Sequence, residues 1–160
     1  MRQELDKILC EKYPKMMVNR NKNMQETCMC WGFECGDGWF NILDQLMGNI
    51  QHHIDWKQAQ KEKYNRGEGC TQVTLDQVKE KFGTLRFYYT GGDDAIDGMV
   101  RMAESMTGVT CEECGNVGER RGGGWVHTYC EPCEEKREAE YAKQTEEYEF
   151  KKLLKEGNEQ

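Results

Sequence analysis

The chain has 160 residues, of which 32% are charged, and a formal net charge of −7. This length allows one domain, or one domain with an extension, around a modest hydrophobic core. No apolar run approaches the ~20 residues of a membrane span, and the first residues lack the apolar stretch of a signal peptide, so we expect a cytosolic protein. The acidic balance excludes a uniformly basic protein that binds DNA non-specifically, but leaves room for a local basic patch.

The first part of the chain is expected to hold two amphipathic helices. Apolar residues at helical spacing predict a helix over residues 3–13, which Pro14 ends. A polar loop and a segment rich in cysteine, glycine and aromatic residues follow, and Asp37, set between two glycines, is expected to cap the second helix. The apolar stripe of that helix is expected to face the core, with a partner helix as the alternative. Its members are Phe40, Leu43, Met47, Ile50 and Ile54.

The middle of the chain predicts a hairpin followed by a third helix. Two strands are expected around a turn at Phe82-Gly83, the second over residues 84–90. The segment before the turn, LDQVKEKF, is also compatible with a short helix. Gly91 and Gly92 break the pattern, and Asp93 or Asp94 is expected to cap the third helix. The apolar face of that helix holds Ile96, Met99, Val100, Ala103 and Met106.

Four cysteines with the spacing C-x2-C-x15-C-x2-C predict a zinc ribbon: Cys111, Cys114, Cys130 and Cys133. Fifteen residues between the pairs suffice for two short strands and a loop, and Gly115 can adopt the positive φ that a tight turn favours. Four thiolates complete a tetrahedron, so we expect structural Zn²⁺. An iron–sulfur cluster and a redox-active pair are the alternatives. His127 either replaces one cysteine as a ligand or points elsewhere.

Two groups of residues are candidates for contact with a ligand or partner. Arg120 and Arg121 are expected at the tip of the glycine-rich loop, where guanidinium groups and free amides suit phosphate or carboxylate groups. A mobile, solvated tip is the alternative. Arg86 and Tyr88 share one face of the second strand and could hold a phosphate and stack a base. The alternative is an ordinary amphipathic outer face.

The remaining cysteines and histidines leave a second metal site open. Cys28, Cys30 and Cys35 could combine with Cys70, or with His52 and His53, although apolar neighbours favour buried thiols. Adjacent histidines on a helix do not share one face, which argues against their joint use. Known catalytic motifs are absent from the sequence, so we expect no enzymatic activity.

These elements divide the chain into a core over residues 1–108, a zinc ribbon over 109–134 and a charged helical tail over 135–160. The core is expected to be α+β, with amphipathic helices packed on a small antiparallel sheet. The tail combines strong helix formers with a sparse apolar stripe. It is expected to dock weakly on the core or to pair with another copy in a homo-oligomer.

Three stretches resemble a widespread group of small bacteriophage-encoded proteins: FECGDGWFNILDQL, VKEKFGTLRFYYTGGDDAIDGMVRMAESMTGVTCEECG and RRGGGWVHTYCEPC. The resemblance spans roughly residues 31–133. It implies a phage accessory protein that is made in the host bacterial cytoplasm and carries a zinc ribbon.

We therefore predict a non-enzymatic, zinc-binding phage accessory protein that binds a host protein or a nucleotide-type signal and counters antiphage defence. Two other functions stay open. One is a zinc-ribbon protein that binds nucleic acid or the transcription machinery, although the acidic charge disfavours nucleic acid. The other is a nucleotide-processing enzyme.

Overall fold

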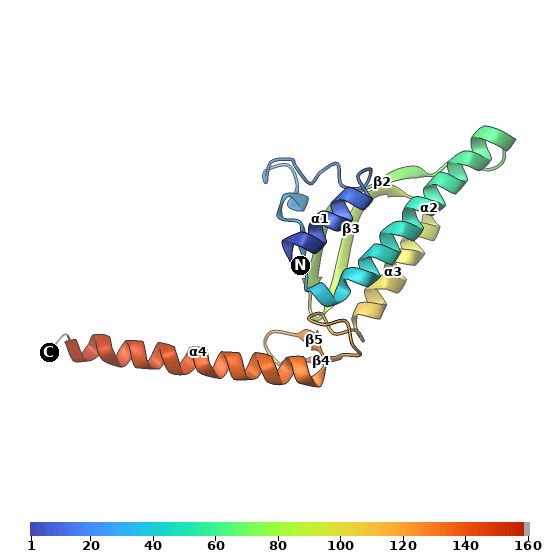
Figure 1. The fold of residues 1–160 in the computed structure, drawn as a ribbon. Coiled ribbons are helices and arrows are strands. Elements are labelled where there is room, and N and C mark those ends of the chain that lie inside the picture. The colour runs from blue at the N-terminus through green and yellow to red at the C-terminus, as the bar shows by residue number, and fades with distance from the viewer. Residues whose placement is uncertain (159–160) are drawn as a thin grey trace.

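The computed structural model describes residues 1–158, with some side chains near the end of the last helix left out, and within that range the chain is α+β (Figure 1). The predicted fold class is therefore confirmed. The helices are α1 (Gln3–Lys12), α2 (Phe40–Tyr64), α3 (Asp94–Thr107) and α4 (Glu131–Asn158). The described helices include none that is both long and apolar enough to cross a membrane.

The main sheet has three strands in the order β1-β2-β3: β1 (Phe33–Glu34), β2 (Thr71–Lys81) and β3 (Thr84–Gly92). The ambiguous segment before the turn is therefore a strand. β2 and β3 pair antiparallel, whereas the short β1 runs parallel to β2. The turn lies at Phe82 and Gly83, as predicted, and both residues have positive φ, of 55° and 78°. Positive φ at both central residues is what a tight hairpin turn requires.

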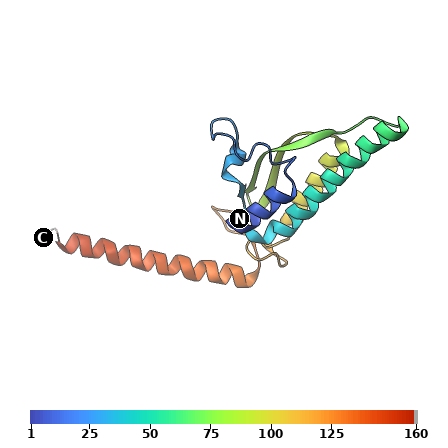
Figure 2. The ribbon, with the colours of Figure 1, turned by 45° about the horizontal axis from the view of Figure 1, so that its top comes forward.

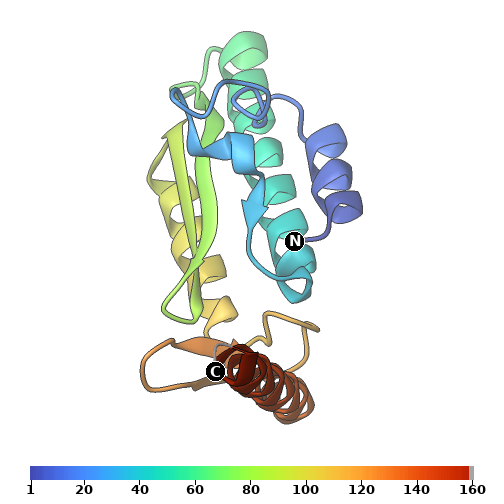
Figure 3. The same ribbon diagram turned by 90° about the vertical axis from the view of Figure 1, so that its left-hand side faces the viewer.

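Helices α2 and α3 contact each other and pack on the sheet, as Figure 3 shows from the side. The predicted stripe of α2 is buried from Leu43 to Ile54, and Phe40 packs at its edge. In α3 the stripe is buried at Ile96, Val100 and Ala103 and partly buried at Met99, while Met106 is exposed. Leu9 of helix α1 and Tyr13, directly after the helix, add to the same core.

Asp37 does not cap α2, and this prediction was wrong. Asp37 is the first residue of a 3₁₀ turn, η2 (Asp37–Trp39), that precedes the helix, and the N-cap position of α2 is Trp39, which makes no side-chain hydrogen bond there. Instead, the Asp37 carboxylate accepts a hydrogen bond from the Arg2 backbone N–H at 2.7 Å and pairs with the Arg2 guanidinium. Asp37 stands a full turn ahead of α2, too early to reach its free amides. Asp93 does cap α3, accepting from the Ile96 N–H at 3.2 Å.

The ribbon, residues 109–134, contains the antiparallel strands β4 (Glu119–Arg121) and β5 (His127–Tyr129). It lies beside the β2–β3 turn, and α4 starts from its second cysteine pair (Figure 3). Helix α4 then extends away from the core as a single helix (Figures 1 and 2). Its described side chains from Glu135 onward are exposed. The tail therefore does not dock on its own core.

Candidate metal centre

The four predicted cysteines come together in the ribbon. The sulfur atoms of Cys111, Cys114, Cys130 and Cys133 all lie within 4.8 Å of one another, and the Cys114 and Cys130 sulfurs are 3.5 Å apart. Cys111 and Cys130 are buried, Cys133 is half-buried and Cys114 is exposed. This cluster could hold a metal ion.

Local backbone geometry aims these sulfurs at one point. The Gly115 N–H donates to the Cys111 carbonyl at 2.9 Å, and Gly115 has the expected positive φ of 80°. This closes a tight turn around the first pair. The second pair stands at the start of α4: Cys130 immediately precedes the helix and Cys133 lies in its first turn, and the Glu134 N–H donates to the Cys130 carbonyl at 3.0 Å. One pair therefore sits on a turn and the other on a helix start.

The thiols of the cluster differ in acidity. The backbone N–H of Cys133 lowers the pKa of the Cys130 thiol to about 7. Burial raises the pKa of the Cys133 thiol. Thiolates rather than thiols bind metals, so a divalent cation would displace the remaining protons and offset half of the negative charge of the four thiolates.

The part of the ribbon that carries the four-cysteine cluster is attached to the core through the segment CGDGW. The backbone carbonyl of Glu112 accepts from the Gly38 N–H at 2.7 Å, and its carboxylate accepts from the Gly36 N–H at 2.8 Å. The Trp39 indole N–H donates to the Thr110 carbonyl at 2.8 Å. A Cβ atom at Gly36 or Gly38 would lie closer than 3.0 Å to the ribbon backbone. These glycines therefore permit close docking, a role that sequence reasoning missed although their spacing around Asp37 was visible.

The β2–β3 turn forms a second attachment for the ribbon. The Arg120 guanidinium donates to the Phe82 carbonyl at 2.8 Å, and the Thr128 hydroxyl donates to the Gly83 carbonyl at 2.5 Å. The ribbon is thus held by two backbone turns of the core. It does not behave as a separately tethered module.

His127 points away from the cysteines and toward α4. Its Nε2 lies 2.7 Å from the Glu134 carboxylate, and both side chains are buried. Arg137 donates to the same carboxylate at 2.7 and 3.1 Å. The Arg137 guanidinium, assisted by His127, lowers the pKa of Glu134 to about 2. Of the two roles considered for His127, the structure therefore shows a brace between β5 and α4.

The four residues expected to contact a ligand do not meet at one point. Arg120 and Arg121 lie in β4 rather than at the loop tip, and Arg121 pairs with Glu131 at 2.6 Å. The Arg86 guanidinium binds within its own strand, to the Thr84 hydroxyl and the Leu85 carbonyl. Tyr88 is exposed on the outer face and lines a pocket of about 560 Å³.

The loop tip presents Trp125 instead, at residues 122–126. The Trp125 side chain is 80% exposed, and it borders a pocket of about 460 Å³. Acidic residues of the core and ribbon line the same pocket: Glu34, Glu80 and Glu112. The sequence analysis assigned ligand contact in this loop to its arginines and overlooked the tryptophan. The signal was a large aromatic residue directly after three glycines, where no regular element could bury it.

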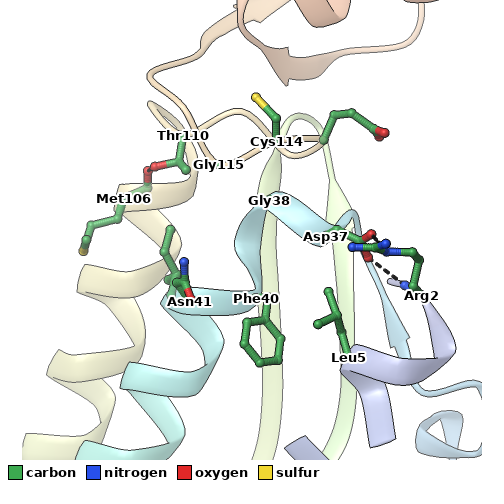
Figure 4. A pocket seen from close by; sticks show the side chains of 12 residues that line it. Arg2, Leu5, Asp37, Gly38, Phe40, Asn41, Met106, Thr110, Cys114 and Gly115 are labelled. Carbon is green, nitrogen blue, oxygen red and sulfur yellow. Dashed lines mark hydrogen bonds and ion pairs between the residues drawn. The ribbon is translucent and has the colours of Figure 1, made fainter. Parts of the chain in front are cut away.

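A pocket of about 700 Å³ lies on the other side of the metal cluster, between α1, α2 and the first cysteine turn (Figure 4). Cys114, Thr110 and Gly115 form its ribbon side, and the Arg2–Asp37 pair closes the opposite edge. The exposed Cys114 of the four-cysteine cluster therefore adjoins this pocket.

The second site that the sequence left open around Cys28, Cys30 and Cys35 is not formed in the part of the chain that the structure describes. Cys28 is exposed, the Cys30 thiol donates to the Thr27 carbonyl at 3.1 Å, and burial raises the pKa of Cys35 to about 12. Among the described residues, the other group with metal-binding geometry is His53, Cys70 and Asp93. His53 and Cys70 were considered in the sequence as ligands of a second metal site, and the structure places them beside Asp93, which was not.

Two features of the ribbon bear on function: the four-cysteine cluster and the exposed tryptophan. A cluster of four cysteines could hold a metal, and its ribbon is fixed to an α+β core with an exposed tryptophan at the tip. Comparisons with protein-family models, with curated proteins and with solved structures find no match.

Proposed function

We propose that the four-cysteine cluster holds a structural zinc ion. Tetrahedral zinc with Zn–S bonds of about 2.3 Å places its sulfurs about 3.8 Å apart. The Cys114–Cys130 separation of 3.5 Å and the upper limit of 4.8 Å for every pair are compatible with that value. Four thiolates leave no coordination position for substrate or an activated water molecule, which favours a structural role over a catalytic one.

We further propose that the protein is a non-enzymatic binding protein whose partner contacts the ribbon tip, and that the partner is a host protein. The observation that carries this proposal is the exposed Trp125 indole on a braced hairpin. Tryptophan is enriched among the few residues that dominate the energy of protein interfaces. Burial of its large apolar surface by a partner would be favourable.

The contacts that hold both ends of the ribbon hairpin make its tip suited to binding a partner. Gly122, Gly123 and Gly124 give the loop little stiffness of its own. The metal cluster, the His127–Glu134 pair and the hydrogen bonds to the β2–β3 turn fix both ends of the hairpin. A held hairpin loses less conformational entropy when it binds, so more of the interface energy contributes to affinity.

The charge around the tip favours a protein over a phosphate-bearing ligand. Three carboxylates line the pocket beside Trp125: Glu34, Glu80 and Glu112. They outnumber its one guanidinium, Arg137, which is already paired with Glu134, so the pocket would repel phosphate groups. The guanidinium groups of Arg86, Arg120 and Arg121 already have partners within the protein. A basic patch on a host protein would complement this acidic surface. The role of a phage accessory protein that counters host defence rests on the sequence resemblance.

The test is capture of partners from bacterial lysate by the zinc-loaded protein, with Trp125→Ala as the variant. Trp56→Ala is the matched control, because Trp56 is also exposed, at 54%, but lies on α2 away from the tip. We expect one host protein to be retained by the native protein and by Trp56→Ala, and lost with Trp125→Ala. Equal retention by all three would contradict the proposal.

The same samples separate the other functions. Mass analysis of co-purified small molecules would reveal a nucleotide ligand, and binding of DNA or RNA that falls steeply with salt would indicate a nucleic-acid protein. Either result without a retained host protein would replace the present proposal.

A further inference from the structure

His53, Cys70 and Asp93 come from three separate segments and meet at the end of the molecule opposite the ribbon. His53 lies in α2, Cys70 immediately precedes β2, and Asp93 joins β3 to α3. One potential ligand atom from each lies within 4.8 Å of the other two. The His53 Nε2 lies 2.9 and 3.1 Å from the two Asp93 oxygens.

We propose that these three side chains form a second metal site, which binds a divalent transition ion such as Zn²⁺. Imidazole, thiolate and carboxylate are the three ligand types that zinc takes in proteins. Calcium and magnesium take oxygen ligands, so a set containing sulfur and nitrogen selects against them. Three protein ligands leave one tetrahedral position open to water.

The capping role of Asp93 does not account for the whole group. Asp93 receives the Ile96 N–H as the cap of α3, and the Lys57 ammonium balances its charge at 3.0 Å. Neither contact requires a thiol, yet the buried Cys70 thiol lies within 4.8 Å of the carboxylate and of His53. Its hydrogen bond to the Thr71 carbonyl is a long one, at 3.6 Å, which leaves the sulfur able to bind a metal that displaces its proton.

The Lys57 ammonium balances the charge of the Asp93 carboxylate, as a bound metal ion would. Its ammonium supplies one positive charge to Asp93, whereas a divalent ion would supply two and would also engage Cys70 and His53. The metal therefore competes with Lys57 for the Asp93 carboxylate. Removing the ammonium should leave the site able to bind metal, and removing a ligand should not.

The two sites are far enough apart to be studied separately. The ribbon contacts the β2–β3 turn, while Cys70 and Asp93 flank the open end of the same hairpin. Because β2 has eleven residues and a strand rises about 3.3 Å per residue, this separation is roughly 30 Å. The His53 and Asp93 side chains are partly exposed, at 18% and 24%, so an ion can enter and exchange.

The experiment is a Co²⁺ titration of full-length protein that already carries one zinc per chain, followed by metal analysis. Bound Co²⁺ should give a sulfur-to-metal charge-transfer band from a single thiolate. The variants Cys70→Ser and His53→Gln should each weaken this binding at least about 10-fold. Lys57→Ala should retain the band, because it removes the competing ammonium and none of the ligands.

Two controls keep the result decisive. Cys28→Ser removes an exposed thiol outside both clusters and should leave the titration unchanged. Circular dichroism and a zinc content of one ion per chain show that each variant is folded. If Cys70→Ser does not fold, His53→Gln still tests the loss of a ligand. The proposal is overturned if native protein binds no second ion, or if the folded ligand variants bind it as tightly as native protein does.

Discussion

The indole N–H of Trp39 donates a hydrogen bond of 2.8 Å to the backbone carbonyl of Thr110, 71 positions later in the chain. Trp39 is completely buried in the core, and Thr110 immediately precedes the first metal-cluster cysteine. The core and the ribbon therefore share a partly buried hydrogen bond, so a substitution in the core is expected to change the stability of the ribbon.

Trp39→Phe should destabilise the protein by about 1–3 kcal/mol, because it leaves the Thr110 carbonyl without its donor while keeping an aromatic ring in the core. Chemical denaturation of the zinc-loaded protein measures this change. The control, Trp56→Phe, alters an exposed indole and should stay within about 0.5 kcal/mol of the native value. Equal effects from the two variants would show that the hydrogen bond contributes nothing.

Removal of the metal should loosen the ribbon before the sheet. A strong chelator, or Cys114→Ser, should speed amide hydrogen exchange in β4 and β5, because the cluster joins the two ends of this hairpin. Exchange in β2 and β3 should change much less, since their core residues do not contact the metal. If amide exchange in β4 and β5 stays as slow after metal removal as before, a structural role for zinc is contradicted.

Gly38→Ala should destabilise the protein and weaken metal binding. The added Cβ would overlap the Cys111 carbonyl and the Gly115 amide nitrogen, both of which are backbone atoms of the first cysteine turn. Gly98→Ala is the matched control, because no atom lies within 4 Å of its added Cβ. Gly98 lies within α3, so this control should stabilise by roughly 0.5–1 kcal/mol. Thermal melting and zinc content of both variants test the contrast.

The Asp44 carboxylate should make stability depend on pH. Burial by itself would raise its pKa, but hydrogen bonds from the Lys12 ammonium and the Tyr13 hydroxyl, each at 2.7 Å, lower the pKa below 3.8. A lowered native pKa means that the stabilisation is present above pH 3.8 and is lost as the pH falls further.

Asp44→Asn should therefore cost about 1–2 kcal/mol at neutral pH. The difference between native protein and variant should be constant above about pH 5 and shrink below pH 3.8. Denaturation of both proteins across this range tests the prediction, and a difference that grows on acidification would refute it.

Residues 141–160 should be dispensable for folding. The described side chains of α4 from Glu135 onward are exposed, and its contacts with the ribbon involve Glu134 and Arg137. A chain ending at Glu140 should keep the native melting temperature and zinc content. Sedimentation of both forms then tests whether the tail pairs two copies, since only the full-length protein would self-associate through it.

The sequence by itself determined the features that depend on local spacing. Helical periodicity located the buried stripe of α2, from Leu43 to Ile54, and the paired turn residues placed the hairpin at Phe82-Gly83. The spacing of the four cysteines identified a cluster that could hold a metal, because two intervening residues make a tight turn around one ion. These signals are readable because neighbours in the chain create them.

Only the tertiary structure decided how distant segments use their polar groups. Asp37 binds Arg2 instead of capping α2, and Arg120 binds the Phe82 carbonyl instead of extending from the loop tip. His53, Cys70 and Asp93 meet although 40 positions separate the first from the last. Such partners are chosen by the packing of helices and strands, which brings together groups whose spacing along the chain carries no pattern.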